Sequence, residues 1–255
     1  MSSLLSFYSH NSGVLLSKAL AHLALSGVAM AIALALALPA GVYLGHRHRG
    51  AVAAINLANA FRALPSLALI AICLAIFGVS KADVEIALVA LAVPPILTNA
   101  FTAVDNVDPD AVESARGMGM NERQILTRIE LPVSWPLIFA GIRTASVFVI
   151  ATATLAGIFG GGGLGDIVAN QPAYRLVGVI AATLVIAVLA FAVDALLGVL
   201  QRLLTPRGLR IAPQLRSLFP ATMSTGANPV GPMQAEPLTL PAGVSPARVQ
   251  PDAGP

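Results

Sequence analysis

Charged side chains are scarce in this sequence. Only 11% of its 255 residues are Asp, Glu, Lys or Arg, about half the fraction usual in a soluble domain. This shortage excludes an ordinary water-soluble globular protein, because too few charges are present to cover its surface. Cysteine is scarcer still. The single Cys73 excludes an internal disulfide, and its place within an apolar run predicts a buried, unreactive thiol.

Lysine and aromatic residues are also rare. The formal charge of +3 comes mostly from arginine, because Lys18 and Lys81 are the only lysines, and aromatic residues make up 5% of the chain. The arginines fall between apolar blocks and form no patch with interleaved aromatics, so the basic character indicates membrane topology and lipid headgroups rather than nucleic acid. Too few aromatics cluster to form a cage for a quaternary ammonium ligand.

Apolar residues are abundant, at 56% of the chain, and they occur in long blocks. The mean hydropathy is +0.81. The blocks predict an all-α membrane protein, each block being long enough to cross a hydrocarbon core of about 30 Å. The first block, of about 25 residues, exceeds the roughly 7–15 of a secretory signal, so we interpret it as a retained span. The five predicted spans are about 19–45, 51–79, 84–104, 136–159 and 176–204.

Arginine placement predicts the orientation of these spans. Arginines follow the first, third and fifth spans, whereas the opposite loops hold only Lys18, Lys81 and Arg175. By the positive-inside rule, the N-terminus is outside and the C-terminus is cytoplasmic. We therefore predict an external segment over 1–18, a membrane domain over 19–204, and a cytoplasmic tail over 205–255. The tail is rich in Pro, Ala, Gly and Ser without apolar periodicity, which predicts disorder.

One polar segment, residues 108–132, interrupts the apolar blocks on the cytoplasmic side. Its first half predicts a short helix. Asp108 can cap this helix, with Pro109 at its first position. Gly117 and Gly119 then end it.

The second half of the polar segment predicts another short helix. Asn121 can cap it, and Gln124 completes a capping box. Pro132 disfavours helical geometry at Leu131, so we predict that the helix ends there. Two interpretations fit the apolar side: a helix resting on the membrane surface, or a helix inserted in a groove of a cytoplasmic partner, with Glu113 paired to a basic residue. That side comprises Met118, Met120, Ile125, Leu126 and Ile129.

The spacing of six residues in the polar segment resembles the EAA loop of bacterial ABC importer permeases. It departs from that pattern once, with Ser114 in place of the middle alanine. The resemblance implies a type I (MetI-like) permease fold and a loop that sits in a cleft of an ATP-hydrolysing subunit. It also implies that this chain is no enzyme and holds no cofactor, ATP and Mg²⁺ being bound by the partner. The matching residues are Glu113, Ala115, Gly119, Ile129, Leu131 and Pro132.

Longer stretches resemble the osmoprotectant permeases, importers of glycine betaine, carnitine, choline or proline betaine. The resemblance implies a multi-pass protein of the bacterial cell membrane, a second permease of the same or a homologous chain, and a separate extracytoplasmic substrate-binding protein. Permeases for methionine-type amino acids or other small solutes share the five-span plan and remain an alternative. An intramembrane enzyme is disfavoured, since no nucleophile–base pattern occurs within the spans. The stretches are RALPSLALIA (62–71), 94–120, AGIRTASV (140–147) and FGGGGLGD (159–166).

Three charged residues lie well inside the ends of the predicted spans, where each is a functional hypothesis. Arg62 precedes Pro65 and Ser66. We expect these three near the translocation path, or else at a helix break from which Arg62 snorkels. Arg143 and Asp194 are predicted to lie at similar depth on neighbouring spans and to form a structural ion pair.

A glycine run follows the fourth span. The resemblance favours a gate loop beneath the binding protein, the alternative being an ordinary flexible turn. A phosphate-binding loop is excluded, because no Lys-Ser or Lys-Thr pair follows. The glycines are Gly160, Gly161, Gly162 and Gly163.

The four histidines form no evident metal-ligand set with nearby carboxylates, so no metal site is predicted. The HRH motif at 46–48 is interpreted as a topology anchor. The histidines are His10, His22, His46 and His48.

Overall fold

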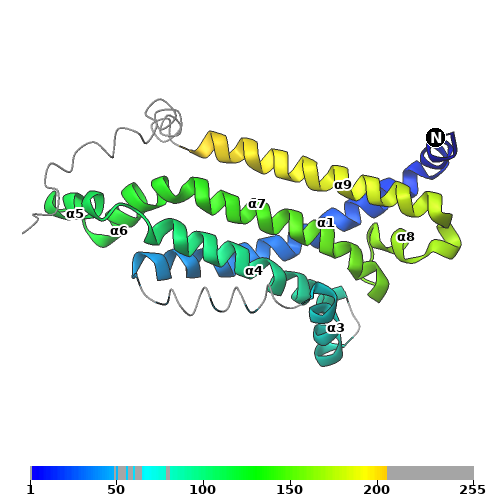
Figure 1. Ribbon diagram of the computed structural model, residues 1–255, viewed down its shortest axis with the longest axis horizontal. Coiled ribbons are helices and arrows are strands. Elements are labelled where there is room, and N and C mark those ends of the chain that lie inside the picture. Colours follow the sequence, from blue (N-terminus) through cyan, green and yellow to red (C-terminus); the bar gives the residue numbers. More distant parts are fainter. Residues whose placement is uncertain are drawn as a thin grey trace, which may run out of the picture. The chain divides into compact units, whose positions relative to one another are not determined.

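The computed structural model describes residues 2–48, 50, 56, 60, 65–78 and 81–205. Every regular element among these residues is a helix, which confirms the all-α class (Figure 1). A π turn (η1) and a 3₁₀ turn (η2) flank the central helix α7. The elements are α1 (Ser2–His46), α3 (Ser66–Phe77), α4 (Lys81–Asp105), α5 (Pro109–Gly117), α6 (Glu122–Ile125), η1 (Leu126–Glu130), α7 (Leu131–Ala156), η2 (Gly157–Phe159), α8 (Gly165–Ala169) and α9 (Gln171–Leu204).

Among the described residues, four helical stretches are long and apolar enough to cross a membrane. They match four of the five predicted spans and run over Leu4–His46, Asp83–Asp105, Glu122–Phe159 and Gln171–Leu204. The predicted span over 51–79 is described only in part, at residues 56, 60 and 65–78. The continuous part contains α3, an apolar helix of 12 residues, which at 1.5 Å per residue is too short to span by itself. The predicted tail also lies outside the described residues, apart from Thr205.

Helix α1 begins at Ser2, so the helix extends through most of the predicted external segment over 1–18 and into the first predicted span. A kink at Asn11 (φ −116°, ψ 17°) interrupts α1, where the Asn11 side chain donates to the Phe7 carbonyl at 3.1 Å. Long-range contacts hold the early turns, since the Tyr8 hydroxyl donates to the Ala181 carbonyl of α9 at 3.0 Å. Hydropathy missed these turns because their order comes from packing on α9.

Small residues allow α1 and α4 to lie very close together. A Cβ added to Gly41 would lie 2.7 Å from the Leu97 carbonyl oxygen, and one added to Gly45 would lie 2.8 Å from that of Phe101. Small residues at four-residue intervals are a common packing solution for helices in membranes. On α1 the buried small residues are Ala29, Ala33, Ala37, Gly41 and Gly45.

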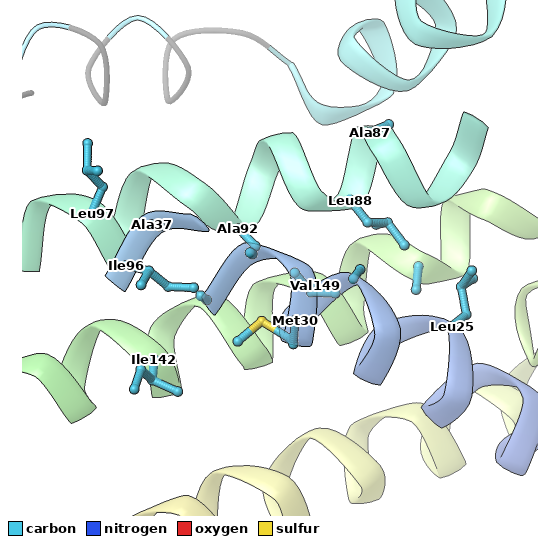
Figure 2. Packing of buried hydrophobic residues seen from close by; sticks show 14 of the residues in the cluster. Leu25, Met30, Ala37, Ala87, Leu88, Ala92, Ile96, Leu97, Ile142 and Val149 are labelled. Carbon is cyan, nitrogen blue, oxygen red and sulfur yellow. The ribbon is translucent and has the colours of Figure 1, made fainter. Parts of the chain in front are cut away.

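The main hydrophobic core joins α1, α4 and α7. Figure 2 shows their side chains meeting, among them Met30, Ile96 and Ile142. A Cβ on Gly141 of α7 would lie 2.9 Å from the Pro95 carbonyl oxygen of α4, so these helices are also in close contact. Cys73 of α3 is buried in this cluster, as predicted. Helix α9 packs on the side of α7 that faces away from α4 (Figure 1).

Candidate functional site

The polar segment folds locally as its capping residues predict. The Asp108 side chain accepts a hydrogen bond from the Asp110 N–H at 3.0 Å, and Pro109 occupies the first turn of α5. Helix α5 ends at Gly117. Gly119 then adopts φ +83°, a conformation that disfavours side chains with a Cβ. The predicted first helix is confirmed.

A capping box begins α6. The Gln124 N–H donates to Asn121 Oδ1 at 3.0 Å, and the Asn121 N–H donates to Gln124 Oε1 at 2.9 Å. These two bonds satisfy N–H groups that the helix itself leaves free. The predicted second helix is also confirmed at its start.

The prediction that the second helix ends before Pro132 was wrong. Leu131 is helical (φ −60°, ψ −48°), and its N–H donates to the Leu126 carbonyl five residues back. A proline inside an α-helix clashes with the carbonyl four residues earlier, and the wider π turn over Leu126–Glu130 relieves that clash. The polar segment therefore runs into α7 as one continuous helical stretch.

The apolar side of the polar segment mostly packs within the segment. Ile125 and Ala115 are fully buried and form a small cluster with Val107 and Val112, against which Met120 and Ile129 pack. Met118 alone of the predicted apolar set is strongly exposed, at 70%. The predicted partner-facing apolar side is therefore largely an internal core that fixes α5 against α6.

The segment nevertheless offers an exposed face. Glu113 and Gly119 are exposed, and a Cβ on Gly119 would meet no atom within 4 Å. The other four resembling positions are buried or half-buried: Ala115, Ile129, Leu131 and Pro132. The six EAA-type positions thus divide into an exposed set and a supporting set.

A histidine clamp ties the polar segment to α1. His46 Nδ1 lies 2.7 Å from Glu130 Oε2, and His46 Nε2 lies 3.4 Å from Glu122 Oε2. The Glu130 side chain is only 3% exposed and that of His46 12%. Both ring nitrogens face carboxylate oxygens, so only the protonated imidazolium can donate to both. The clamp joins the last residue of α1 to both ends of the α6–η1 stretch.

Sequence reasoning missed this clamp. The available signal was positional: His46 ends the first span and Glu130 precedes the fourth, and the orientation rule places both at the same membrane boundary. A second pair there joins His48 Nδ1 to Asp105 Oδ1 at 2.8 Å. Within the residues that the structure describes, no group of three or more His, Cys, Asp or Glu could hold a metal ion.

The structure brings Arg143 and Asp194 together. Arg143 Nε donates to Asp194 Oδ1 at 2.8 Å and Nη2 donates to Oδ2 at 2.7 Å, a bidentate contact between α7 and α9. Gln201 extends the network, because its Oε1 lies 3.4 Å from Arg143 Nη1 and its Nε2 donates to the Pro136 carbonyl at 3.2 Å. Planar, two-bond pairing of this kind is geometrically specific. The pair also lines an apolar cavity of about 730 Å³ between α7 and α9.

The glycine loop (residues 160–163) packs against α1. Gly160, Gly162 and Gly163 have φ of +76°, +86° and +76°. A Cβ on Gly163 would lie 3.1 Å from Nδ1 of His22, a fully buried side chain whose Nε2 lies 2.9 Å from the Ile150 carbonyl. Three of the four glycines therefore adopt conformations that favour glycine, and Gly163 lies directly against α1.

One further ion pair lies next to the glycine loop, and the other predicted path residues lie on a different element. Asp166, just after the glycine loop, pairs with Lys18 of α1, which sequence reasoning missed. Pro65 and Ser66 begin α3, which packs on α4 and α7, whereas Gly163 of the glycine loop lies against α1. Arg62 lies outside the described residues.

Comparison with known proteins finds one matching family and several similar permeases. A family model described as "Binding-protein-dependent transport system inner membrane component" matches residues 27–207. The chain is 37% identical over 215 residues to the glycine betaine/carnitine/choline transport system permease protein OpuCB of Bacillus subtilis, covering 82% of this chain and 97% of that relative. Identity is also 37% to the choline transport system permease protein OpuBB of Bacillus subtilis (82% and 97% covered), and to the carnitine transport permease protein OpuCB of Listeria monocytogenes (83% and 98% covered).

A solved structure shares the fold. An inward-facing structure of the MetNI methionine ABC transporter aligns with a TM-score of 0.64 at 21% identity, covering 75% of this chain and 96% of that one. At this identity the likeness establishes the fold alone.

Proposed function

Because the chain belongs to the family of binding-protein-dependent transport system inner membrane components, we propose that it is the permease subunit of an ATP-driven importer of osmoprotectants. Glycine betaine, choline, carnitine and proline betaine are the proposed solutes. The observation that carries the choice is identity of 37% over nearly the full length of relatives named for such solutes. A methionine-type permease is less favoured, since the likeness to MetNI extends to the fold only.

The proposed topology has five spans in a bacterial cell membrane, with the N-terminus outside and the C-terminus in the cytoplasm. Four long apolar helices support four of these spans. The apolar helix α3 lies inside the fifth, the predicted span over 51–79. Arg116, Arg123 and Arg128 of the polar segment support the orientation, because arginine favours the cytoplasmic side.

We propose that the polar segment docks on a separate ATPase subunit, which binds ATP and Mg²⁺ and catalyses hydrolysis. Exposed Glu113 would face a basic residue of that subunit, and bare Gly119 would permit close backbone approach. Since the segment is continuous with α7 and clamped to α1 by His46, a displacement of the segment moves two spans at once. ATP-driven closure could thereby alternate the access of the pore.

The translocation path is proposed to form with a second permease, the same or a homologous chain, fed by an extracytoplasmic binding protein. The glycine loop would be the external gate, and its backbone shape against α1 supports a defined position. Arg62, Pro65 and Ser66 are proposed to line the path. Arg143 and Asp194 would serve as a brace between α7 and α9.

The test is ATP hydrolysis by the complete transporter in liposomes. The complex would contain this chain, its ATPase and its binding protein, with glycine betaine, choline, carnitine and methionine compared as ligands. We expect stimulation by a betaine-type ligand and its loss in Glu113→Arg. Asp110→Arg, one turn earlier on α5, is the matched charge reversal and should retain most stimulation. Stimulation by methionine alone would overturn the solute, and failure of any ATPase to associate would overturn the coupling role.

A further inference from the structure

A basic cavity of about 760 Å³ lies where the end of α1 meets the polar segment. Its lining includes three arginines, two histidines and one carboxylate: Arg47, Arg116, Arg123, His46, His48 and Glu122. None of the functions proposed above uses this cavity. Its charge is strongly one-sided, which calls for an anionic occupant.

The neighbouring carboxylates neutralise only part of this charge. Glu122 pairs with Arg116, with Oε1 3.3 Å from Nε, and it also faces His46. Asp105 pairs with His48 from α4. Among the residues that the structure describes, no carboxylate lies at ion-pair distance from Arg47 or Arg123.

Arg47 is instead held by an aromatic ring. Its guanidinium carbon lies 5.6 Å from the centroid of the Tyr43 ring, one helical turn earlier. Two guanidinium groups without a carboxylate partner among the described residues thus line one cavity from different elements: Arg47 from the turn after α1, and Arg123 from α6. Guanidinium groups match the geometry of phosphate oxygens.

The outer face of α1 identifies the source of the phosphate. Val28, Ile32, Leu36 and Tyr43 are all exposed and follow one another at helical spacing. On a membrane span such a stripe faces hydrocarbon, and a tyrosine at its end is typical of the interface with the headgroups. Arg47 follows Tyr43 by one turn, so an interfacial Tyr43 would place the Arg47 guanidinium near the lipid phosphates.

We propose that the basic cavity binds the headgroup phosphate of an anionic phospholipid whose acyl chain lies along this stripe. Cationic pockets at the cytoplasmic ends of spans are suited to such headgroups. A free phosphate would contact the basic cavity but not the adjoining apolar stripe. An acidic protein surface would likewise not contact the stripe, which faces the acyl chains. The bound lipid would bridge α1 and the polar segment. This inference does not depend on which solute the transporter carries.

The experiment measures lipid retention by the purified transporter. The permease–ATPase complex would be equilibrated with vesicles of phosphatidylcholine containing phosphatidylglycerol, extracted, and analysed for bound lipid by native mass spectrometry. We expect retained phosphatidylglycerol in the wild-type complex. In the double variant Arg47→Gln/Arg123→Gln its apparent affinity should fall at least about tenfold, since a charge-assisted hydrogen bond is lost at each site.

Two variants control for charge and for folding. Arg128→Gln removes an exposed arginine of the polar segment outside the cavity lining, and it should retain wild-type levels of phosphatidylglycerol. Arg47→Lys/Arg123→Lys keeps both charges and should retain more lipid than the glutamine pair. Unchanged retention in the glutamine pair would overturn the proposal.

Two further outcomes would assign the cavity to another occupant. Displacement of phosphatidylglycerol by excess inorganic phosphate, to the level of the glutamine pair, would show a site for free anions and overturn the lipid assignment. Loss of the ATPase subunit from the glutamine pair, with phosphatidylglycerol unchanged, would make the cavity part of the protein interface. Because the readout is bound lipid, it remains interpretable even if the transported solute is misassigned.

Discussion

The two ends of α7 are built in opposite ways. At its beginning, a capping box, a π turn and the histidine clamp join it to the polar segment without a break. At its end, a 3₁₀ turn leads into three glycines with positive φ. The first end is suited to the proposed transmission of displacement, because each turn is bonded to the next and to α1. The second end depends on backbone shapes that few other residues adopt. The beginning of α7 is therefore fixed by bonds to its neighbours, whereas its end is fixed by the backbone conformation of the glycines that follow.

The largest effect is expected at the second end. A Cβ on Gly157 would lie 2.0 Å from the carbonyl carbon of Gly165, a backbone atom that cannot move away independently. Gly157→Ala should therefore reduce the free energy of unfolding by more than the ~1–3 kcal/mol that is usual for overpacking, because the clash is with backbone. The measurement is the thermal unfolding temperature of the purified complex, which should fall strongly.

The matched control is Gly160→Ala. Gly160 has φ +76° but no atom within 4 Å of an added Cβ, so its cost should be limited to strain of about 1–2 kcal/mol. Equal destabilisation by both variants would show that conformation, rather than close packing, limits this end of α7.

Breaking the histidine clamp should have the next largest effect. His46→Ala leaves the Glu130 carboxylate buried without its partner, and loss of one member of a buried pair typically costs about 3–5 kcal/mol. His46→Ala/Glu130→Gln removes the stranded charge and should recover much of that loss. Thermal unfolding reports stability, and transported solute per ATP hydrolysed reports coupling. Restored stability with restored coupling would contradict the view that the clamp transmits movement.

The brace between α7 and α9 should give a moderate effect. Its side chains are 36% and 31% exposed, so its contribution to stability is smaller than that of a fully buried pair. Arg143→Asp and Asp194→Arg should each reduce transport, because each places two like charges face to face. The double reversal should rescue transport, measured at equal membrane levels of protein. Absence of rescue would count against a purely pairwise role.

The smallest effect is expected from the capping box. Asn121→Ala removes the acceptor for the Gln124 N–H and should cost about 1 kcal/mol of local helix stability. Hydrogen–deuterium exchange over 122–125 should accelerate about fivefold, while the unfolding temperature of the whole complex hardly changes. Gln124→Ala removes the reciprocal bond and should act similarly. Unchanged exchange in both would mean that burial of Ile125 alone orders α6.

The parts of this molecule that sequence predicts well are those with local causes. Asp108, Asn121 and Gln124 act on backbone groups two or three residues away, so their caps are readable from a single stretch. The bounds of α4 were also close to prediction, because its hydropathy changes sharply at both ends. Fold class follows from the length and number of apolar blocks.

The features that sequence missed have distant causes. Pro132 is a helix breaker by local rules, and only the π turn before it makes it compatible with a helix. Glu130 and His46 are 84 residues apart and meet only in the folded structure, where the end of α1 lies against η1. The first turns of α1 are ordered by α9, more than 170 residues away in the case of Tyr8 and Ala181. Such contacts require the tertiary fold.

The π turn has a further consequence for the angular phase of α7. A π turn carries the equivalent of one residue added to an α-helix, and each α-helical residue advances the face by about 100°. Deleting Thr127, within this turn, would let the helix close into regular α geometry. The polar segment would then be rotated relative to the buried face of α7, and the side chains of Glu122 and Glu113 would point in a new direction around the helix axis. The direction in which the proposed docking face points is therefore set by a single residue of the π turn.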